Sequence, residues 1–462
     1  MSTTLIQFSY LVAAVLFIIG LRNLSSPKTA TMGNNLAAVG MLIAMVATLS
    51  YANVVDYKIV IAGVVVGSVI GVIAAQRIAM TAMPQMVALL NGFGGAASVL
   101  VASAEVIASL HKGVELTGIV PGAIVASVLI GGITLTGSLI AYAKLQELMT
   151  GAPIQYPAQQ YINALIAIGT LVLCVVMAMD PLNTNLLIAL TVVSLLLGVL
   201  LTIPIGGADM PVVIALLNSY SGIAACATGF VLDNSALVIS GSLVGASGIF
   251  LTKIMCDAMN RSLGNVLFGA FGAQTEQAAG GAEQQGNVIA YTPVDASVIF
   301  SNARSVVIVP GYGMAVSQAQ HAVRELADIL VSKGIEVNFA IHPVAGRMPG
   351  HMNVLLAEAD VPYDRMIEMD EINPQFPETD VVLVLGANDV VNPAAREDKS
   401  SPIYGMPILE VDKAQRVFVI KRSMNPGFAG IQNPLFFKEN TMMIFGDAKK
   451  VMIALNDAIK NY

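Results

Sequence analysis

The chain has 462 residues, of which 56 % are hydrophobic and only 11 % are charged, and its mean hydropathy is +0.75. Soluble proteins carry roughly a quarter charged residues, so this composition excludes an entirely soluble protein. The net charge of −7 argues against nucleic acid as the main partner, because phosphate binding requires a basic surface.

The charges are distributed unevenly along the chain. Residues 1–270 hold 8 basic and 8 acidic residues, which leaves 15 basic (23 − 8) and 22 acidic (30 − 8) residues for 271–462. After Arg261 the hydrophobicity falls, and a segment rich in Gly, Ala and Gln follows. The pattern predicts a transmembrane domain over 1–262, a flexible linker over 263–287 and a soluble domain over 288–462.

A helix that spans a membrane needs about 20 mostly apolar residues. About nine segments fit: 4–21, 34–50, 58–76, 83–103, 118–142, 161–179, 184–203, 211–232 and 235–256. The first lacks the positive region of a cleaved signal, so we interpret it as a span. Basic residues in the short loops favour a periplasmic N-terminus and a cytoplasmic C-terminal domain, with Lys58 and Lys112 on the outer side. On the inner side we place Arg22, Lys28, Arg77, Lys144, Lys253 and Arg261.

Polar residues inside membrane spans are costly and therefore informative. Asn91, Ser138, Ser247 and the run 218–221 lie within predicted spans. An interhelical hydrogen bond explains each one alone, but together they indicate a hydrated path through the bundle. The repeated glycines at 63, 67 and 71 and at 241 and 245 are explained by close helix packing. Cys174, Cys226 and Cys256 have no spacing typical of a metal site or a disulfide framework, and we expect no metal.

Short β-branched runs alternate with helical stretches after residue 288. We expect strands at Ser305–Val309, Glu336–Ile341, Arg365–Met369, Asp380–Leu385, Arg416–Ile420 and Met442–Phe445, and helices at 315–332, 350–359 and 447–460. This alternation predicts a doubly wound, mostly parallel α/β sheet of the Rossmann type. The predicted fold is therefore a bundle of about nine transmembrane helices followed by a Rossmann-like domain.

Three features of the soluble domain concern nucleotide binding. Gly311 and Gly313 follow the first strand and suit a close approach to a pyrophosphate, although Val316 takes the third glycine position of the motif. The second strand ends at His342, without the acid that holds the ribose of NAD. Lys421-Arg422-Ser423 offers two cations and a hydroxyl to a 2′-phosphate. These features favour NADP over the alternatives, a glycine turn in another α/β domain and a solvated basic pair.

Several longer stretches distributed over both halves carry a resemblance: Gly206–Val213, Leu217–Gly222, Met259–Ser262, Pro310–Val316, Ile341–Glu358, Gly386–Ala395 and Lys421–Gly430. The chain resembles the beta subunits of proton-translocating NAD(P) transhydrogenases over essentially its whole length. The resemblance implies an enzyme that transfers hydride between NADH, held by a separate alpha subunit, and NADP, held by this chain. It implies coupling to proton translocation, a dimer of alpha–beta units, and a multi-pass location in the bacterial cytoplasmic membrane.

The resemblance also implies site residues. Arg347 and the Gly311–Gly313 turn approach the pyrophosphate, Lys421, Arg422 and Ser423 bind the 2′-phosphate, and Asp389 and the Gly427–Gly430 loop close over the nucleotide. The other cofactor-binding residues implied are Tyr312, Met314, Ala315, Val316, Gly386, Asn388, Phe428 and Ala429. The proton path is implied to include Asn91, Ser138, Asn218 and Ser247, with Asp209 and Arg261 at its cytoplasmic end. No protein acid or base is expected in hydride transfer, because the cofactors carry the chemistry.

Two residues depart from the family pattern. Many relatives have a histidine at Asn91, and asparagine cannot titrate, so another group such as Asp209 must do so. Phe428 stands where relatives may have tyrosine, so no hydroxyl contact is assigned there. Two alternatives remain at this stage: a transporter whose C-terminal domain only senses a nucleotide, and a membrane-anchored NADP enzyme that does not pump.

Overall fold

The computed structural model describes residues 3–24, 26–51, 57–151, 153–207, 209–268, 288–401, 403–425, 427 and 430–462. The chain divides into two compact units. One comprises Met1–Gly206 and Val212–Thr252, and the other comprises Gly207–Pro211 and Lys253–Tyr462. Of the expected linker, Leu263–Phe268 forms a short helix, α10, and residues 269–287 lie outside the described residues.

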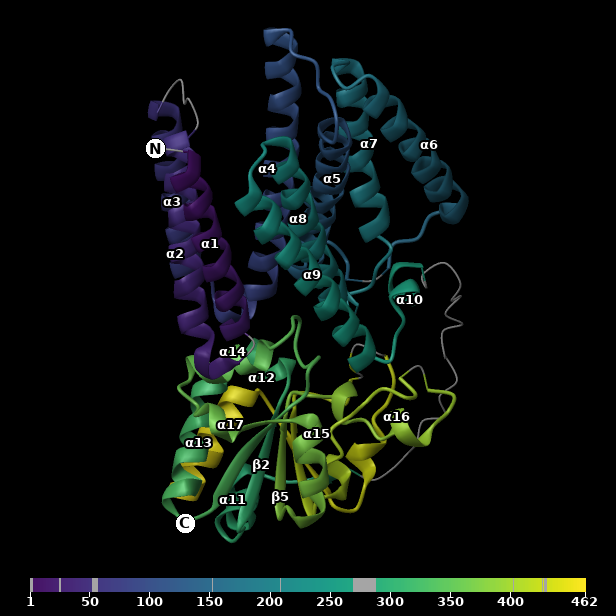
Figure 1. Cartoon of the computed structure of the whole chain (residues 1–462). Coiled ribbons are helices and arrows are strands. Elements are labelled where there is room, and N and C mark those ends of the chain that lie inside the picture. Colours follow the sequence, from purple (N-terminus) through teal and green to yellow (C-terminus); the bar gives the residue numbers. More distant parts are fainter. Residues whose placement is uncertain are drawn as a thin grey trace. The chain divides into compact units, whose positions relative to one another are not determined.

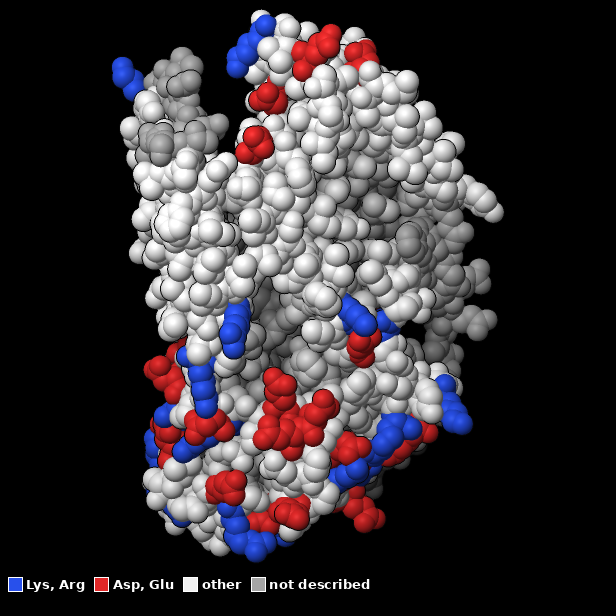
Figure 2. Space-filling view, in the orientation of Figure 1, with Lys and Arg blue, Asp and Glu red and all other residues white. Residues whose placement is uncertain are grey.

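The described part of the chain contains nine helices that are long and apolar enough to cross a membrane (Figure 1). They are α1 (Thr3–Leu24), α2 (Pro27–Tyr51), α3 (Tyr57–Arg77), α4 (Met83–Lys112), α5 (Val120–Leu145), α6 (Gln159–Met179), α7 (Thr184–Thr202), α8 (Met210–Val231) and α9 (Ser235–Ala258). On the face in Figure 2 their flanks are almost free of charge, whereas the C-terminal α/β part carries charges of both signs. The predicted membrane bundle is confirmed.

Two spans are longer than the hydropathy predicted. Helix α2 begins at Pro27, seven residues before the expected start, because proline is well tolerated in the first turn of a helix. Helix α4 continues to Lys112, nine residues beyond the expected end, and stops where Gly113 adopts a left-handed conformation with φ of 65°. Helix termini of this kind depend on capping rather than on hydropathy.

Glycines let neighbouring helices in the bundle approach closely. A Cβ atom at Gly241 on α9 would lie 2.4 Å from the backbone nitrogen of Cys226 on α8, and one at Gly222 would lie 2.4 Å from that of Gly245. The packing predicted for Gly241 and Gly245 is therefore present. For Gly63, Gly67 and Gly71 it is not: no described atom lies within 4 Å of their Cβ positions, and α3 buries none of its residues.

We predict that Gly241→Ala destabilises the membrane unit, whereas Gly67→Ala does not. The new methyl group at Gly241 meets backbone that has no room to move, which typically costs about 1–3 kcal/mol. At Gly67 the methyl group enters open space and alanine is the better helix former. The midpoint of thermal unfolding in detergent should fall for Gly241→Ala alone. Equal midpoints in the two variants would show that the α8–α9 contact does not matter for stability.

The C-terminal unit contains a seven-stranded sheet whose paired strands are all parallel, in the order β1-β7-β6-β5-β2-β3-β4. The strands are β1 (Ile289–Ala290), β2 (Ser305–Pro310), β3 (Glu336–Ile341), β4 (Met366–Glu368), β5 (Val381–Leu385), β6 (Arg416–Lys421) and β7 (Thr441–Phe445). All six predicted strands are confirmed. Sequence reasoning missed β1, because two residues at a sheet edge are too short to show a period.

Alternate residues of the central strands face opposite layers, as the pleat of a strand requires. Val307 and Val309 of β2 and Val417 of β6 join a core cluster with residues of α15 (Met369–Ile372) and of the turns around it. Phe418 faces the other way and packs against Phe300, at 5.2 Å between ring centroids. That second layer consists of α11 (Pro293–Ser301), α13 (Gln320–Ser332) and α17 (Ala448–Lys460), which lie together in Figure 1. The remaining α-helices are α12 (Tyr312–Ser317), α14 (His351–Glu358) and α16 (Ala394–Glu397).

Two helix predictions need correction. The helix expected over 315–332 is two helices, α12 and α13, because Gln318 is left-handed with φ of 50° and interrupts the hydrogen-bond ladder. Helix α11 was not predicted at all. Its signal is nevertheless present, since Thr292 and Asp295 form a reciprocal capping box in front of Pro293.

Candidate functional site

The strand order places a topological switch point between β2 and β5. The chain passes from β2 to β3 on one side, while β5, β6 and β7 extend on the other side. The connections therefore diverge above the carboxyl ends of β2 and β5. In open α/β sheets, ligands bind in the crevice at such a point.

At this point three glycines let the chain after β2 contact the chain after β5. A Cβ atom at Gly386 would lie 2.3 Å from Cα of Gly313, and one at Gly311 would lie 2.4 Å from the nitrogen of Ala387. The amide of Gly311 donates to the Leu385 carbonyl and that of Gly313 to the Gly386 carbonyl, both at 2.9 Å. These two amides thus join β2 to β5. Next to them Met314 and Ala315 are buried, and the Val316 side chain is exposed.

Arg347 reaches the turn from the loop after β3. Its guanidinium carbon lies 4.4 Å from the centroid of the Tyr312 ring, a cation–π contact. Both side chains are half-buried. The structure therefore places a cation and an aromatic ring beside the glycine turn at the switch point.

The loop after β5 meets the loop after β6. A Cβ atom at Gly427 would lie 2.5 Å from Nδ2 of Asn388 and 2.7 Å from a carboxylate oxygen of Asp389. Asn433 holds the same segment, since its Nδ2 donates to the Asn388 carbonyl at 3.0 Å. Gly430 is left-handed with φ of 69°, while Phe428 and Ala429 lie outside the described residues. Asp389 and Gly427, two of the residues implied to close over the nucleotide, therefore lie next to each other.

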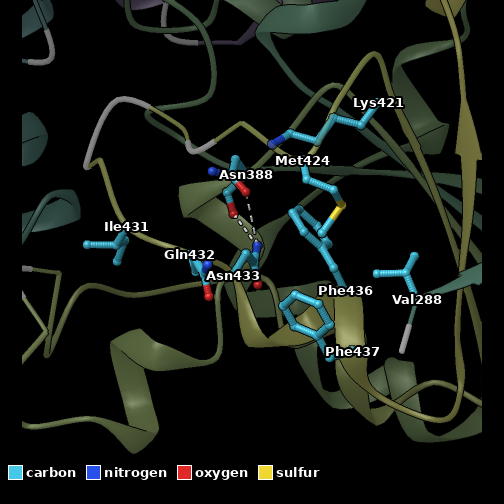
Figure 3. Close-up of a pocket in the computed structure, with 9 residues that line it drawn as sticks. All are labelled: Val288, Asn388, Lys421, Met424, Ile431, Gln432, Asn433, Phe436 and Phe437. Carbon is cyan, nitrogen blue, oxygen red and sulfur yellow. Dashed lines mark hydrogen bonds between the residues drawn. The ribbon is translucent and has the colours of Figure 1, made fainter. Parts of the chain in front are cut away.

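Lys421, the last residue of β6, lines a cavity of about 210 Å³ (Figure 3). Its Nζ donates to the carbonyl of Asn425 and lies 5.2 Å from the centroid of the Phe436 ring. Burial lowers the pKa of Lys421, and the charge of Asp389 opposes that shift. The other lining residues are Val288, Asn388, Met424, Ile431, Gln432, Asn433, Phe436 and Phe437.

Arg422 and Ser423 follow Lys421 directly and are exposed. The Ser423 hydroxyl accepts a hydrogen bond from the Asn425 amide at 3.4 Å. Sequence reasoning did not find Asn433 and Phe436 in this region. A signal for Asn433 exists, because Asn before Pro is a typical helix cap and this side chain caps η7 (Pro434–Phe437).

His342, in the loop after β3, and His351, the first residue of α14, are both buried. Burial lowers the pKa of each to about 4, opposed at His342 by a hydrogen bond with the Pro407 carbonyl and reinforced at His351 by the charge of Arg347. Both imidazoles are therefore neutral near pH 7. Each accepts a backbone hydrogen bond within the loop, which is a structural role.

The polar residues of the membrane unit are divided between its interior and its surface. Asn91 on α4 is buried and donates to the Ile214 carbonyl of α8 at 3.4 Å. Ser138 on α5 is buried beside Gly92, and its hydroxyl has no hydrogen-bond partner among the described residues. Asn218 is half-buried on α8, whereas Ser247 on α9 is exposed and donates back to the Val244 carbonyl.

Of the basic residues that were assigned to short loops, all but Arg261 lie within helices, and Lys144 differs from the rest because it is buried. It lies in the last turn of α5, only 3 % exposed, and its Nζ donates to the carbonyls of Ile203 and Ile205 at 2.6 and 2.7 Å. The Lys144 ammonium group therefore binds two carbonyl groups just beyond the end of α7. A lysine there is satisfied by backbone dipoles, which are partially negative at a helix C-terminus.

Asp209 and Arg261 form an ion pair at 3.4 Å. Burial raises the pKa of Asp209, and the charge of Arg261 opposes that shift. One Asp209 oxygen is buried without a hydrogen-bond partner among the described residues. Within the same described ranges no group of three or more His, Cys, Asp or Glu side chains is placed to hold a metal ion.

The comparisons with known proteins agree with each other. The family model for the NAD(P) transhydrogenase beta subunit matches residues 6–458. The chain belongs to this family. Two curated relatives from Rhodospirillum rubrum, both named NAD(P) transhydrogenase subunit beta, are 52 % identical over 456 residues, 98 % of this chain and of each relative.

Membership in the transhydrogenase beta-subunit family has three direct consequences. The chain is a membrane protein with an oxidoreductase role, the family acts on nicotinamide nucleotides, and a beta subunit implies an alpha partner. The resemblance inferred from the sequence is thereby confirmed. The seven parallel strands with their switch point form an open α/β sheet of the kind in which dinucleotides bind.

We predict that Gly386→Ala is more damaging than Gly334→Ala. Both glycines are left-handed, with φ of 67° and 82°, so both variants incur a backbone cost of about 1–2 kcal/mol. Only at Gly386 does the added methyl group also collide with the β2 turn, which adds about 1–3 kcal/mol. Thermal unfolding of the two purified variants measures the difference. If both lose the same stability, the contact with Gly313 is not important.

Proposed function

We propose that this chain binds NADP(H) and couples hydride exchange with NAD(H), held by an alpha subunit, to proton translocation across the membrane. The observation that supports it most is the convergence of the ends of β2, β5 and β6 on one point. There a glycine turn, a half-buried lysine and a loop closed by Asp389 lie together. Family membership supplies the reaction class.

The choice of NADP over NAD rests on two strand ends. After β3 the chain continues into His342, which is buried, neutral and bonded to the Pro407 carbonyl, so no carboxylate stands where NAD-type domains bind the ribose. After β6, Lys421 lines the 210 Å³ cavity, and Arg422 and Ser423 are exposed beside it. Two cations and a hydroxyl match the oxygens of a phosphate monoester. These residues fit the 2′-phosphate of NADP.

The other residues that we propose to contact NADP(H) lie around the switch point. We assign Arg347, whose guanidinium lies over the Tyr312 ring, to the pyrophosphate. The Gly311–Gly313 turn allows the backbone to approach the same group closely. Met314, Ala315 and Val316 continue the turn into α12. To the covering side we assign Gly386, Asn388, Asp389, Gly427 and Gly430, and also Phe428 and Ala429, which lie outside the described residues.

In this reaction the residues of the chain bind, orient and exclude water. NADP, when bound, supplies the nicotinamide carbon that accepts or releases hydride. We assign no catalytic acid or base, because hydride passes directly between the two nicotinamides. The protein contributes by placing the nucleotide at the carboxyl ends of the central strands.

Coupling requires that protonation along the proton path changes the affinity for NADP(H). By linkage, nucleotide binding must then change proton affinity by the same factor. We place the path along Asn91, Ser138, Asn218 and Ser247. Asn91 cannot titrate, so we assign the titrating role to Asp209, whose pKa is raised by burial and whose partner is Arg261.

The organisation that we propose follows from this function. Residues 1–262 form the proton-translocating domain, 263–287 a flexible linker and 288–462 the NADP(H)-binding domain. The C-terminal domain faces the cytoplasm, where nicotinamide nucleotides are available, and the spans lie in the bacterial cytoplasmic membrane. The active assembly is a dimer of alpha–beta units.

We predict that Lys421→Ala/Arg422→Ala lowers the affinity for NADP(H) at least tenfold and leaves the weak affinity for NAD(H) unchanged. Each lost hydrogen bond to a charged phosphate is worth about 1.5–3 kcal/mol. Titration calorimetry with the full chain in detergent measures both affinities. Lys449→Ala, in the exposed part of α17, is the matched control. A wild-type chain that prefers NAD(H), or does not bind either dinucleotide, would contradict the proposal.

We also predict that the chain is inactive in transhydrogenation when reconstituted alone. It contains a single parallel sheet among its described residues and therefore one candidate dinucleotide site. Adding an alpha subunit to the same vesicles should restore hydride transfer from NADH to NADP together with a pH change inside. Transfer by the beta chain alone would show that it holds both nucleotides.

A further inference from the structure

The loop between β3 and α14 is folded around two buried imidazoles. Nδ1 of His342 accepts the backbone N–H of Val344 at 3.2 Å, and Nδ1 of His351 accepts that of Arg347 at 3.1 Å. His342 and His351 are 2 % and 0 % exposed. Two of the loop amides therefore hydrogen-bond to ring nitrogens instead of water.

These hydrogen bonds determine which nitrogen carries the proton. A ring nitrogen that accepts an N–H bond is unprotonated, so in both residues the proton is on Nε2. In His342 this Nε2–H donates to the Pro407 carbonyl at 2.9 Å. In His351, Nε2 is buried and has no partner among the described residues. Within the described chain, the His351 ring makes its hydrogen bond to the Arg347 backbone through Nδ1.

The His351 ring packs against the backbone at Gly346, where a side chain would not fit. Gly346, next to Arg347, has φ of 106°, and a Cβ atom there would lie 2.4 Å from Nδ1 of His351. Gly350 is left-handed as well, with φ of 68°, and begins α14 directly before His351. Two unusual backbone conformations are thus kept around one imidazole, which indicates that its position relative to Arg347 is specific.

Both the backbone and the side chain of Arg347 make contacts that fix its position. Its backbone N–H is bonded to His351, and its guanidinium lies 4.4 Å over the Tyr312 ring beside the glycine turn. An arginine on a loop otherwise has many rotamers and backbone states, and ordering them on binding reduces affinity. Fixing the backbone beforehand removes part of that cost.

We propose that His351 is a positioning residue that presents Arg347 to the diphosphate of the bound dinucleotide through the Nδ1 hydrogen bond. This inference rests on the proposed function, because it requires that Arg347 contacts the nucleotide. His351 itself does not touch the ligand. It acts by fixing the backbone from which the guanidinium extends.

Two substitutions separate the hydrogen bond from the bulk of the ring. His351→Asn places an amide oxygen where Nδ1 lies and keeps an acceptor for Arg347. His351→Gln extends its amide to the position of Nε2 and removes that acceptor. With the full chain in detergent and NADPH as the probe, we expect His351→Asn to bind within about twofold of wild type and His351→Gln about tenfold more weakly.

A double-variant cycle tests whether the effect passes through Arg347. Arg347→Ala alone should weaken NADPH binding about tenfold or more, as loss of a charged contact does. His351→Gln combined with Arg347→Ala should then bind no more weakly than Arg347→Ala alone. Additive losses, or equal binding by the Asn and Gln variants, would overturn the inference.

The outcomes distinguish this inference from the proposed function. If Arg347→Ala binds NADPH normally while Lys421→Ala/Arg422→Ala does not, NADP binding stands and the role of His351 is refuted. If neither set of variants affects binding, the proposed site itself is wrong. Should His351→Gln fail to fold, hydrogen exchange in the wild-type chain decides. The Arg347 amide must exchange slowly, and fast exchange of that amide refutes the hydrogen bond.

Discussion

The C-terminal unit depends on a backbone contact that no side chain could replace. Gly311 and Gly313 lie against Gly386 and Ala387 so closely that a single methyl group on either side would overlap the opposite chain. This contact draws the ends of β2 and β5 together, and the Gly386 amide in turn donates to the Ile420 carbonyl of β6. Asp389 follows β5, Lys421 is the last residue of β6, and Arg347 reaches the same region from the loop after β3.

The membrane unit satisfies its polar groups in a different way. In an apolar interior a polar side chain needs a partner, and backbone carbonyls of a neighbouring helix are the nearest acceptors. Asn91 uses that of Ile214, Ser219 that of Gly245, and Lys144 those of Ile203 and Ile205. Other buried polar atoms have no described partner, among them the Ser138 hydroxyl and the side-chain nitrogens of Asn23, Gln159 and Asn163.

Much of the fold was predictable from the sequence, and less of the site. Nine spans and six strands followed from runs of apolar and β-branched residues, because burial in lipid or in a sheet imposes those periods directly. The helix ends at Gly113 and Gln318 did not follow, because capping geometry determined them. Lys144 was assigned to a loop because composition cannot distinguish a lysine just outside a helix from one buried in its last turn.

By itself the sequence determined the two-part architecture, the parallel sheet and the family, because each depends on local composition or on long motifs. Only the tertiary structure decided that the amides of Gly311 and Gly313 bind β5, that Lys421 lines a cavity with Phe436, and that His351 holds Arg347. It also left Ser247 on the surface and placed Gly63, Gly67 and Gly71 beside no described neighbour. These outcomes depend on which residues distant in the chain come within a few ångströms, and the pairing of distant residues is not encoded in any local pattern.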